Sequence, residues 1–169
     1  MKGLKKIAGY LYLIVLSLWV GGLSLFTFMV TPVIFKSFHR DLAADIVARL
    51  FPFYFVFTLM AAALSLVLFL LAFPRKGPLM YRFCIGLLVL AVMLSVYGNF
   101  RLYPEIVSVK REVYSFERVP PEDPARVRFR SLHARSAVLN LVMIVDGLTV
   151  LLSSVRLSRW DSDRDQQPR

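Results

Sequence analysis

The sequence has little of the residues on which disulfide and metal chemistry depend. Its 169 residues include one cysteine and two histidines. A single cysteine excludes an intramolecular disulfide and any Cys-x-x-Cys site, and a structural metal site takes three or four protein ligands. The sequence also contains no phosphate-binding glycine loop, no His-Glu-x-x-His motif and no recognisable nucleophile–base pair. We therefore predict a chain that is not an enzyme and that carries no cofactor.

Acidic residues are scarce as well. Asp and Glu number 11 against 21 Lys and Arg, which gives a formal net charge of +10. Such a balance often accompanies nucleic-acid binding. In this sequence the basic residues flank apolar blocks instead of clustering on a polar domain. We therefore expect anionic lipid headgroups, and no nucleic acid, as partners of this positive charge.

Apolar residues are in excess. They make up 57% of the chain, whereas a soluble domain is about 45–50% apolar. The excess falls into four blocks, at about residues 7–30, 51–73, 80–100 and 136–155. Each block is long enough for a helix to cross a hydrocarbon core of roughly 30 Å, and unbroken runs exclude a barrel of alternating strands. The sequence thus predicts an all-α integral membrane four-helix bundle that forms a single domain.

The first block runs too far to be a signal peptide, whose apolar region has about 7–15 residues and ends at a small-x-small cleavage site. It continues through Trp19-Val20-Gly21-Gly22 without such a site. We expect Trp19, Gly21 and Gly22 to serve helix packing. Trp19 supplies a bulky side chain, and the two glycines leave a gap beside it. Small residues four apart, as at Ser17 and Gly21, also allow helices to approach closely in lipid.

Prolines suggest where the helices end. Pro32 is expected to end the first helix, and Pro104 to end or kink the third, because each lacks a backbone N–H. Pro52 is expected near the start of the second helix, where a missing donor costs nothing. The segment 74–78 predicts a tight turn between antiparallel neighbours.

Two further helices are expected outside the four blocks. Phe38, Leu42, Ile46 and Leu50 recur every four residues, which predicts a short amphipathic helix, either at the membrane interface or as a solvated connector packed on the bundle. Residues 101–135 predict a helical hairpin that protrudes from the bilayer. In its second arm, Asp123 before Pro124 has the pattern of an N-cap followed by proline at the first helical position.

An even number of membrane helices places both termini on one side. Basic residues in short segments near the membrane favour the cytoplasm for that side, because such residues are retained there. We therefore expect cytoplasmic termini, with the hairpin on the opposite face of the membrane.

The fourth block carries polar residues at helical spacing. His133, Asn140, Gly147 and Ser154 fall every seven residues, and a second stripe lies about 100° away. The opposite face is wholly aliphatic, so the polar stripes are expected to point into the bundle. The residues of the candidate intramembrane polar site are Asp146, Asn140, His133, Thr149 and Ser153.

Asp146 is the one acid in a membrane core. A charged Asp at the bilayer centre costs about 2.5–3.5 kcal/mol on the insertion scale, so we expect a neutral or hydrogen-bonded carboxyl. It is either a proton or cation relay, or a structural carboxyl that bonds to a neighbouring helix. The structural interpretation is favoured, because no second intramembrane acid or base is available as a relay partner.

The two histidines leave an alternative open. His133, and with it His39, would hold a haem or a metal if the first and fourth helices were adjacent, since haem iron takes an axial ligand such as histidine. That would make the chain a membrane redox protein. Both histidines are expected at the membrane surface on the hairpin side, and neither lies within an apolar block.

Three motifs carry a resemblance to a known family. Trp19-Val20-Gly21-Gly22, the segment 30–35 (Val-Thr-Pro-Val-Ile-Phe) and the segment 50–55 (Leu-Phe-Pro-Phe-Tyr-Phe) resemble small bacterial membrane proteins grouped as domain of unknown function 4149, to which the eukaryotic transmembrane protein 205 group is related. The segment 129–136, followed by Leu139-Asn140, resembles the start of that family's last helix.

The resemblance implies a four-helix membrane protein without an established activity. A more distant likeness to copper-resistance D-type and membrane haem proteins is weakened by the absence of histidine within the apolar blocks. We therefore expect a small polytopic protein of the bacterial inner membrane. It would act as a transport-related or accessory subunit, as a homo-oligomer or within a larger membrane complex.

Overall fold

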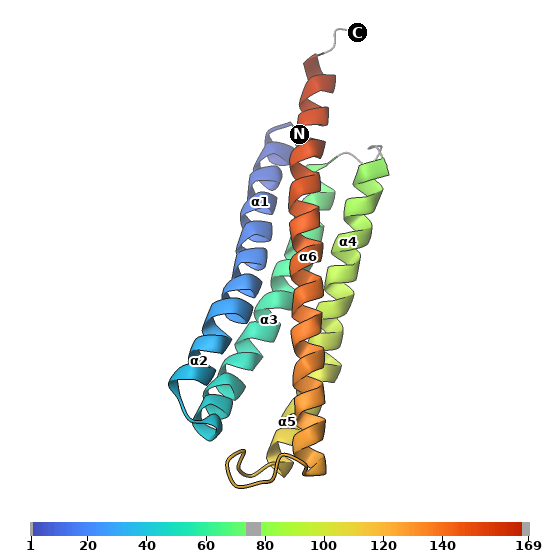
Figure 1. Ribbon diagram of the computed structural model, residues 1–169. Coiled ribbons are helices and arrows are strands. Elements are labelled where there is room, and N and C mark those ends of the chain that lie inside the picture. The colour runs from blue at the N-terminus through green and yellow to red at the C-terminus, as the bar shows by residue number, and fades with distance from the viewer. Residues whose placement is uncertain (1, 74–78, 167–169) are drawn as a thin grey trace.

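The described chain is built of long helices that run side by side (Figure 1). The computed structural model describes residues 2–73 and 79–166, and side chains over 3–73 and 79–157. The elements in chain order are α1 (Lys2–Leu25), η1 (Phe26–Val30), α2 (Thr31–Ser37), α3 (Arg40–Ala72), α4 (Leu79–Tyr97), η2 (Gly98–Leu102), α5 (Tyr103–Glu112) and α6 (Pro124–Gln166). The all-α prediction is confirmed. The turn expected at 74–78 lies outside the described residues.

Four helical rods are long and apolar enough to cross a membrane. They comprise Gly3–Ser37, Arg40–Ala72, Leu79–Glu112 and Pro124–Leu157. Each has 33 to 35 residues, or roughly 50 Å at 1.5 Å per residue, so each extends beyond a hydrocarbon core of about 30 Å. The prediction of four membrane helices is confirmed, and the rods are longer than the apolar blocks that predicted them.

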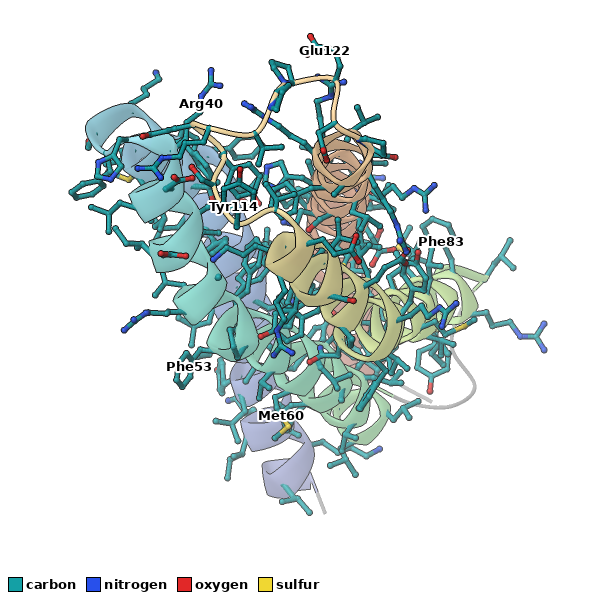
Figure 2. All side chains as sticks on the ribbon, turned by 90° about the horizontal axis from the view of Figure 1, so that it is seen from below. Arg40, Phe53, Met60, Phe83, Tyr114 and Glu122 are labelled. Atoms are coloured by element: carbon teal, nitrogen blue, oxygen red, sulfur yellow. The ribbon has the colours of Figure 1, made fainter. Side chains whose placement is uncertain are left out.

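The outer surface of the bundle is apolar. Figure 2 shows Phe53 and Met60 of α3 and Phe83 of α4 pointing away from the other helices, and they are 77%, 66% and 51% exposed. Large apolar side chains exposed over several helices are unfavourable in water and favourable in lipid. The surface therefore fits a hydrocarbon environment.

The prediction that Pro32 ends the first helix is wrong. The chain stays helical through Ser37, because the π-helical turn η1 precedes the proline and the Thr31 N–H donates to the Phe26 carbonyl, five residues back. A π turn is wider than an α turn and shifts the hydrogen-bond register by one residue, which accommodates the proline ring and its lost N–H. Pro32 then lies in the first turn of α2, where a missing donor costs little.

Pro104 is accommodated in the same way. The π turn η2 precedes it, the Tyr103 N–H donates to the Gly98 carbonyl, and the helix continues through α5 to Glu112. The expectation that Pro104 ends the helix is therefore wrong. Within η2, Asn99 Nδ2 lies 2.6 Å from the carbonyl oxygen of Phe55 and donates to it, which ties this turn to α3.

No separate amphipathic helix precedes the second membrane helix. Residues 40–50 are the first turns of α3, and Pro52 lies inside that helix, not near its start. Both versions of the short-helix prediction are wrong, because the chain continues through the proline without a break. The residues that face the bundle there are Ala43, Ala44 and Val47, whereas Leu42 and Leu50 of the expected apolar face are exposed.

The start of α6 is predicted correctly. The helix begins at Pro124, and Asp123 Oδ1 accepts the backbone N–H groups of Ala125 at 2.9 Å and Arg126 at 3.4 Å. These are two of the donors that a helix start leaves without an intrahelical partner. The helix then continues into the membrane-length rod without interruption.

Replacing Asp123 by alanine is expected to lower the free energy of unfolding by about 0.5–2 kcal/mol, because the cap bonds are lost. Unfolding of both proteins in the same detergent measures the difference. Glu122→Ala is the matched control, since the neighbouring Glu122 is exposed at the outer edge of the loop (Figure 2). Equal losses for the two variants would contradict the capping role.

Tight contacts between α1 and α6 close the middle of the bundle. Trp19 is fully buried, and a Cβ added to Gly147 would lie 2.6 Å from Val20 Cγ2 and 3.2 Å from Trp19 Cζ3. Helix α1 also contacts α3, where the Phe57 ring lies over Gly22 and an added Cβ would be 2.7 Å from Phe57 Cε1. Gly21, by contrast, lies on the outer surface, with no atom within 4 Å of an added Cβ. Two of the three residues expected to serve packing therefore lie at helix contacts.

Candidate functional site

Helix α6 turns a polar face into the bundle. Asn140, Asp146 and Ser154 are 8%, 5% and 1% exposed. The aliphatic face lies outside, with Val145 64% and Leu152 68% exposed. The orientation follows from the sequence pattern, because in lipid a polar stripe is stable only where it faces other helices or a water-filled cavity.

Two polar contacts join this face to its neighbours. The Tyr12 hydroxyl of α1 lies 2.7 Å from Ser154 Oγ. Because Ser154 uses its single hydroxyl proton on the Val150 carbonyl, at 2.7 Å, Tyr12 is the donor in the first bond. On the α4 side, the Ser95 hydroxyl donates to Met143 Sδ at 3.6 Å. Helix α6 is thus held between α1 and α4, which lie on either side of it (Figure 1).

Asp146 is the most unusual residue of this face. Within residues 3–73 and 79–157, neither of its carboxyl oxygens has a hydrogen-bond partner, although the residue is 5% exposed. Among these residues, the structure shows no hydrogen bond from Asp146 to a neighbouring helix. The Asn140 carbonyl oxygen and Trp19 Nε1 are likewise buried without a partner in the described part. The oxygens of Asp146 and Asn140 can therefore still accept a hydrogen bond from water or bind a cation, and the Trp19 N–H can still donate to water.

The remaining members of the expected site are Thr149, Ser153 and His133. Thr149 donates to the Val145 carbonyl of its own helix at 2.7 Å, and Ser153 is half-buried one turn further along. His133 lies near the start of α6, where its ring faces Phe35 and Phe129 at centroid distances of 6.2 and 6.4 Å. His133 is thus 13 residues from Asp146 along α6, whereas Thr149 is three residues from it.

The histidines are not placed in a common site. His39 is exposed just before α3, and the hollow that it lines does not include His133. Over the described ranges, no group of three or more His, Cys, Asp or Glu side chains is close enough to hold a metal ion.

A groove at the end of the bundle was missed by the sequence reasoning. We call it the arginine groove. It has a volume of about 570 Å³, and its lining residues are Phe35, Arg40, Phe116, Pro121, Arg126, Phe129, Arg130 and His133. They come from α2, α3, α6 and the loop 113–123, so no local pattern in the sequence could reveal it.

The loop that covers this groove is pinned to α3. Asp41 accepts the Ser115 hydroxyl at 2.7 Å and the Phe116 N–H at 2.5 Å. Ser115 Oγ in turn accepts the backbone N–H of Arg118 at 3.2 Å. At the other end of the loop, the Arg126 guanidinium donates to the Val119 carbonyl. These bonds hold the loop across the end of the bundle, between Arg40 and Glu122 in Figure 2.

Taken together, four membrane-length helices with an apolar outer surface and an inward polar stripe define a multi-pass membrane protein. Residues 14–115 match the family described as a domain of unknown function (DUF4149), so the chain belongs to that family. Searches of curated proteins and of solved structures found no match.

Proposed function

We propose that this chain is a non-enzymatic, transport-related or accessory subunit of the bacterial inner membrane. The observation that supports the proposal is the Asp146 carboxyl, which is buried in a membrane-length helix with no partner for either oxygen in the described part of the chain. Ionisable groups within the membrane are costly and typically mark ion or proton paths. Asp146 is the group on which such a path would depend.

Association with another copy or with a larger complex is part of the proposal. Four helices enclose little room for a substrate path, and Trp19 packs against Gly147 in the middle of the bundle. The small residues Ser17 and Gly21 lie exposed on the outer face of α1, where another helix can approach closely. Basic residues near the membrane favour cytoplasmic termini, and the start of α1 and the end of α6 lie at the same end of the bundle (Figure 1).

Replacing Asp146 by asparagine is expected to abolish proton flux into liposomes that contain the purified protein, because an amide cannot exchange a proton. Flux is measured with an enclosed pH-sensitive dye under an imposed potential. Thr149→Val is the matched control on the same helix, since its hydroxyl bonds only its own backbone and its loss should leave flux within about twofold.

Thermal unfolding of the three proteins shows whether the fold is kept. Loss of flux from a stable Asp146→Asn protein, with flux retained by Thr149→Val, supports the transport proposal. Absence of flux from the wild-type protein would contradict it and leave only the accessory role.

A further inference from the structure

The arginine groove combines positive charge with an aromatic wall. Arg40, Arg126 and Arg130 line it, and no acidic residue does. Phe116 and Phe129 lie against each other along it, with ring centroids 4.8 Å apart. A groove of this composition fits a ligand that has an anionic group at one end and an apolar body at the other.

Three acids adjoin groove residues in the sequence, namely Asp41, Glu117 and Glu122, and none of them lines the groove. Asp41 accepts two hydrogen bonds from the loop. In the described part of the chain, neither Arg40 nor Arg130 has an ion pair. The guanidinium groups of Arg40 and Arg130 are therefore available to an external anion.

The first turns of α6 add to this positive charge. The partial positive charge of the helix N-terminus is offset by the Asp123 carboxylate, which caps it. The first turn of α6 has no acidic residue, and Arg126, Arg128 and Arg130 follow within two turns. A bound anion would offset the charge of the arginines that line the groove.

The groove lies at the outer edge of the lipid headgroups. Asp146 lies midway along the apolar residues 136–155, so we take it as the bilayer centre. His133 and Arg130 precede it by 13 and 16 residues, or about 20 and 24 Å along the axis. The hydrocarbon core ends about 15 Å from the centre and the headgroups about 20–22 Å from it. The backbone of His133 therefore lies at the outer edge of the headgroups and that of Arg130 about 2 Å beyond it, from where the long Arg130 side chain can extend back to the lipid phosphates.

We propose that the arginine groove is a binding site for one anionic phospholipid. Its phosphate lies between Arg40 and Arg130, and its acyl chains extend past Phe35 along the outer surface. Phe35 is 42% exposed, so the aromatic wall is continuous with the surface that faces lipid. The loop bonds of Asp41 and Arg126 form the groove in advance, which lowers the ordering cost of binding.

Native mass spectrometry of the chain in an uncharged detergent, with equal phosphatidylglycerol and phosphatidylcholine, tests the proposal. Wild-type protein is expected to retain one phosphatidylglycerol in preference to phosphatidylcholine. The double variant Arg40→Gln/Arg130→Gln is expected to bind phosphatidylglycerol roughly thirtyfold more weakly, about fivefold for each arginine removed. Arg101→Gln/Arg111→Gln removes two exposed arginines that do not line the groove, and should leave binding unchanged.

One further variant and a competitor make the test decisive. Arg40→Lys/Arg130→Lys keeps the charge and should bind more tightly than the glutamine variant, which shows that weak binding is not a folding defect. If the groove variant and the control variant lost the same amount of phosphatidylglycerol binding, the lipid would be attracted by positive charge in general and not by the groove. That result would overturn the proposal. So would equal binding of the two lipids by wild type, or displacement of phosphatidylglycerol by millimolar inorganic phosphate, which would show a site for the free anion.

Discussion

Replacing Trp19 by alanine is expected to lower the free energy of unfolding by about 2–4 kcal/mol. In soluble cores, truncation of a buried Trp costs about 3–5 kcal/mol, from lost transfer energy and from the cavity left behind. In a membrane the transfer part is small, because the unfolded reference is itself in lipid. The cavity part remains, since Trp19 is fully buried and its neighbour Gly147 has no side chain to fill the space.

Unfolding in mixed detergent micelles measures this loss. Leu18→Ala is the control on the adjacent position, because Leu18 is 63% exposed and faces away from the bundle. It should cost well under 1 kcal/mol. A similar value for Trp19→Ala would contradict the view that this side chain holds α1 against α6.

The second large effect is expected at Gly147. Alanine is the better helix former by about 1 kcal/mol, yet Gly147→Ala is expected to destabilise the protein by about 1–3 kcal/mol, the usual cost of overpacking. The added Cβ would lie 2.6 Å from Val20 Cγ2, and the buried Trp19 ring leaves α1 little freedom to shift. The same unfolding measurement reports the change.

Two variants separate steric conflict from other causes. Gly86 of α4 has no atom within 4 Å of an added Cβ, so Gly86→Ala should be neutral or stabilising by up to about 1 kcal/mol. Val20→Ala removes the Cγ2 atom that the new Cβ of Gly147→Ala would contact. The double variant should therefore lose less free energy of unfolding than the sum of the two single losses. Additive losses would show that the two helices do not meet here as described.

Local chemistry accounts for what sequence reasoning predicted well. A run of about 20 apolar residues in lipid must satisfy its backbone within itself, so each block had to be a helix. The inward polar face of α6 follows from spacing alone. The Asp123 cap involves residues two and three positions apart, and it forms as predicted.

The same local rules failed at the prolines. Pro32, Pro52 and Pro104 each suggested a helix boundary, and each lies within a continuous rod. The cost of a proline in a helix is a few kcal/mol. Adjustment of the backbone in the π turns η1 and η2, and the packing of long neighbouring helices, offset that cost at Pro32 and Pro104. A prediction from short stretches of sequence includes the local cost of the proline. It does not include the contacts with other helices that offset this cost.

By itself, the sequence determined the membrane class, the four helices and the inward face of α6, because these depend on neighbours in the chain and on the lipid. Only the tertiary structure decided that Trp19 meets Gly147, that Asp146 has no bonding partner within the described chain, and that Arg40 and Arg126, 86 positions apart, share a groove. These features arise where separate helices come together. Their residues carry no common spacing, and so packing in three dimensions alone brings them into contact.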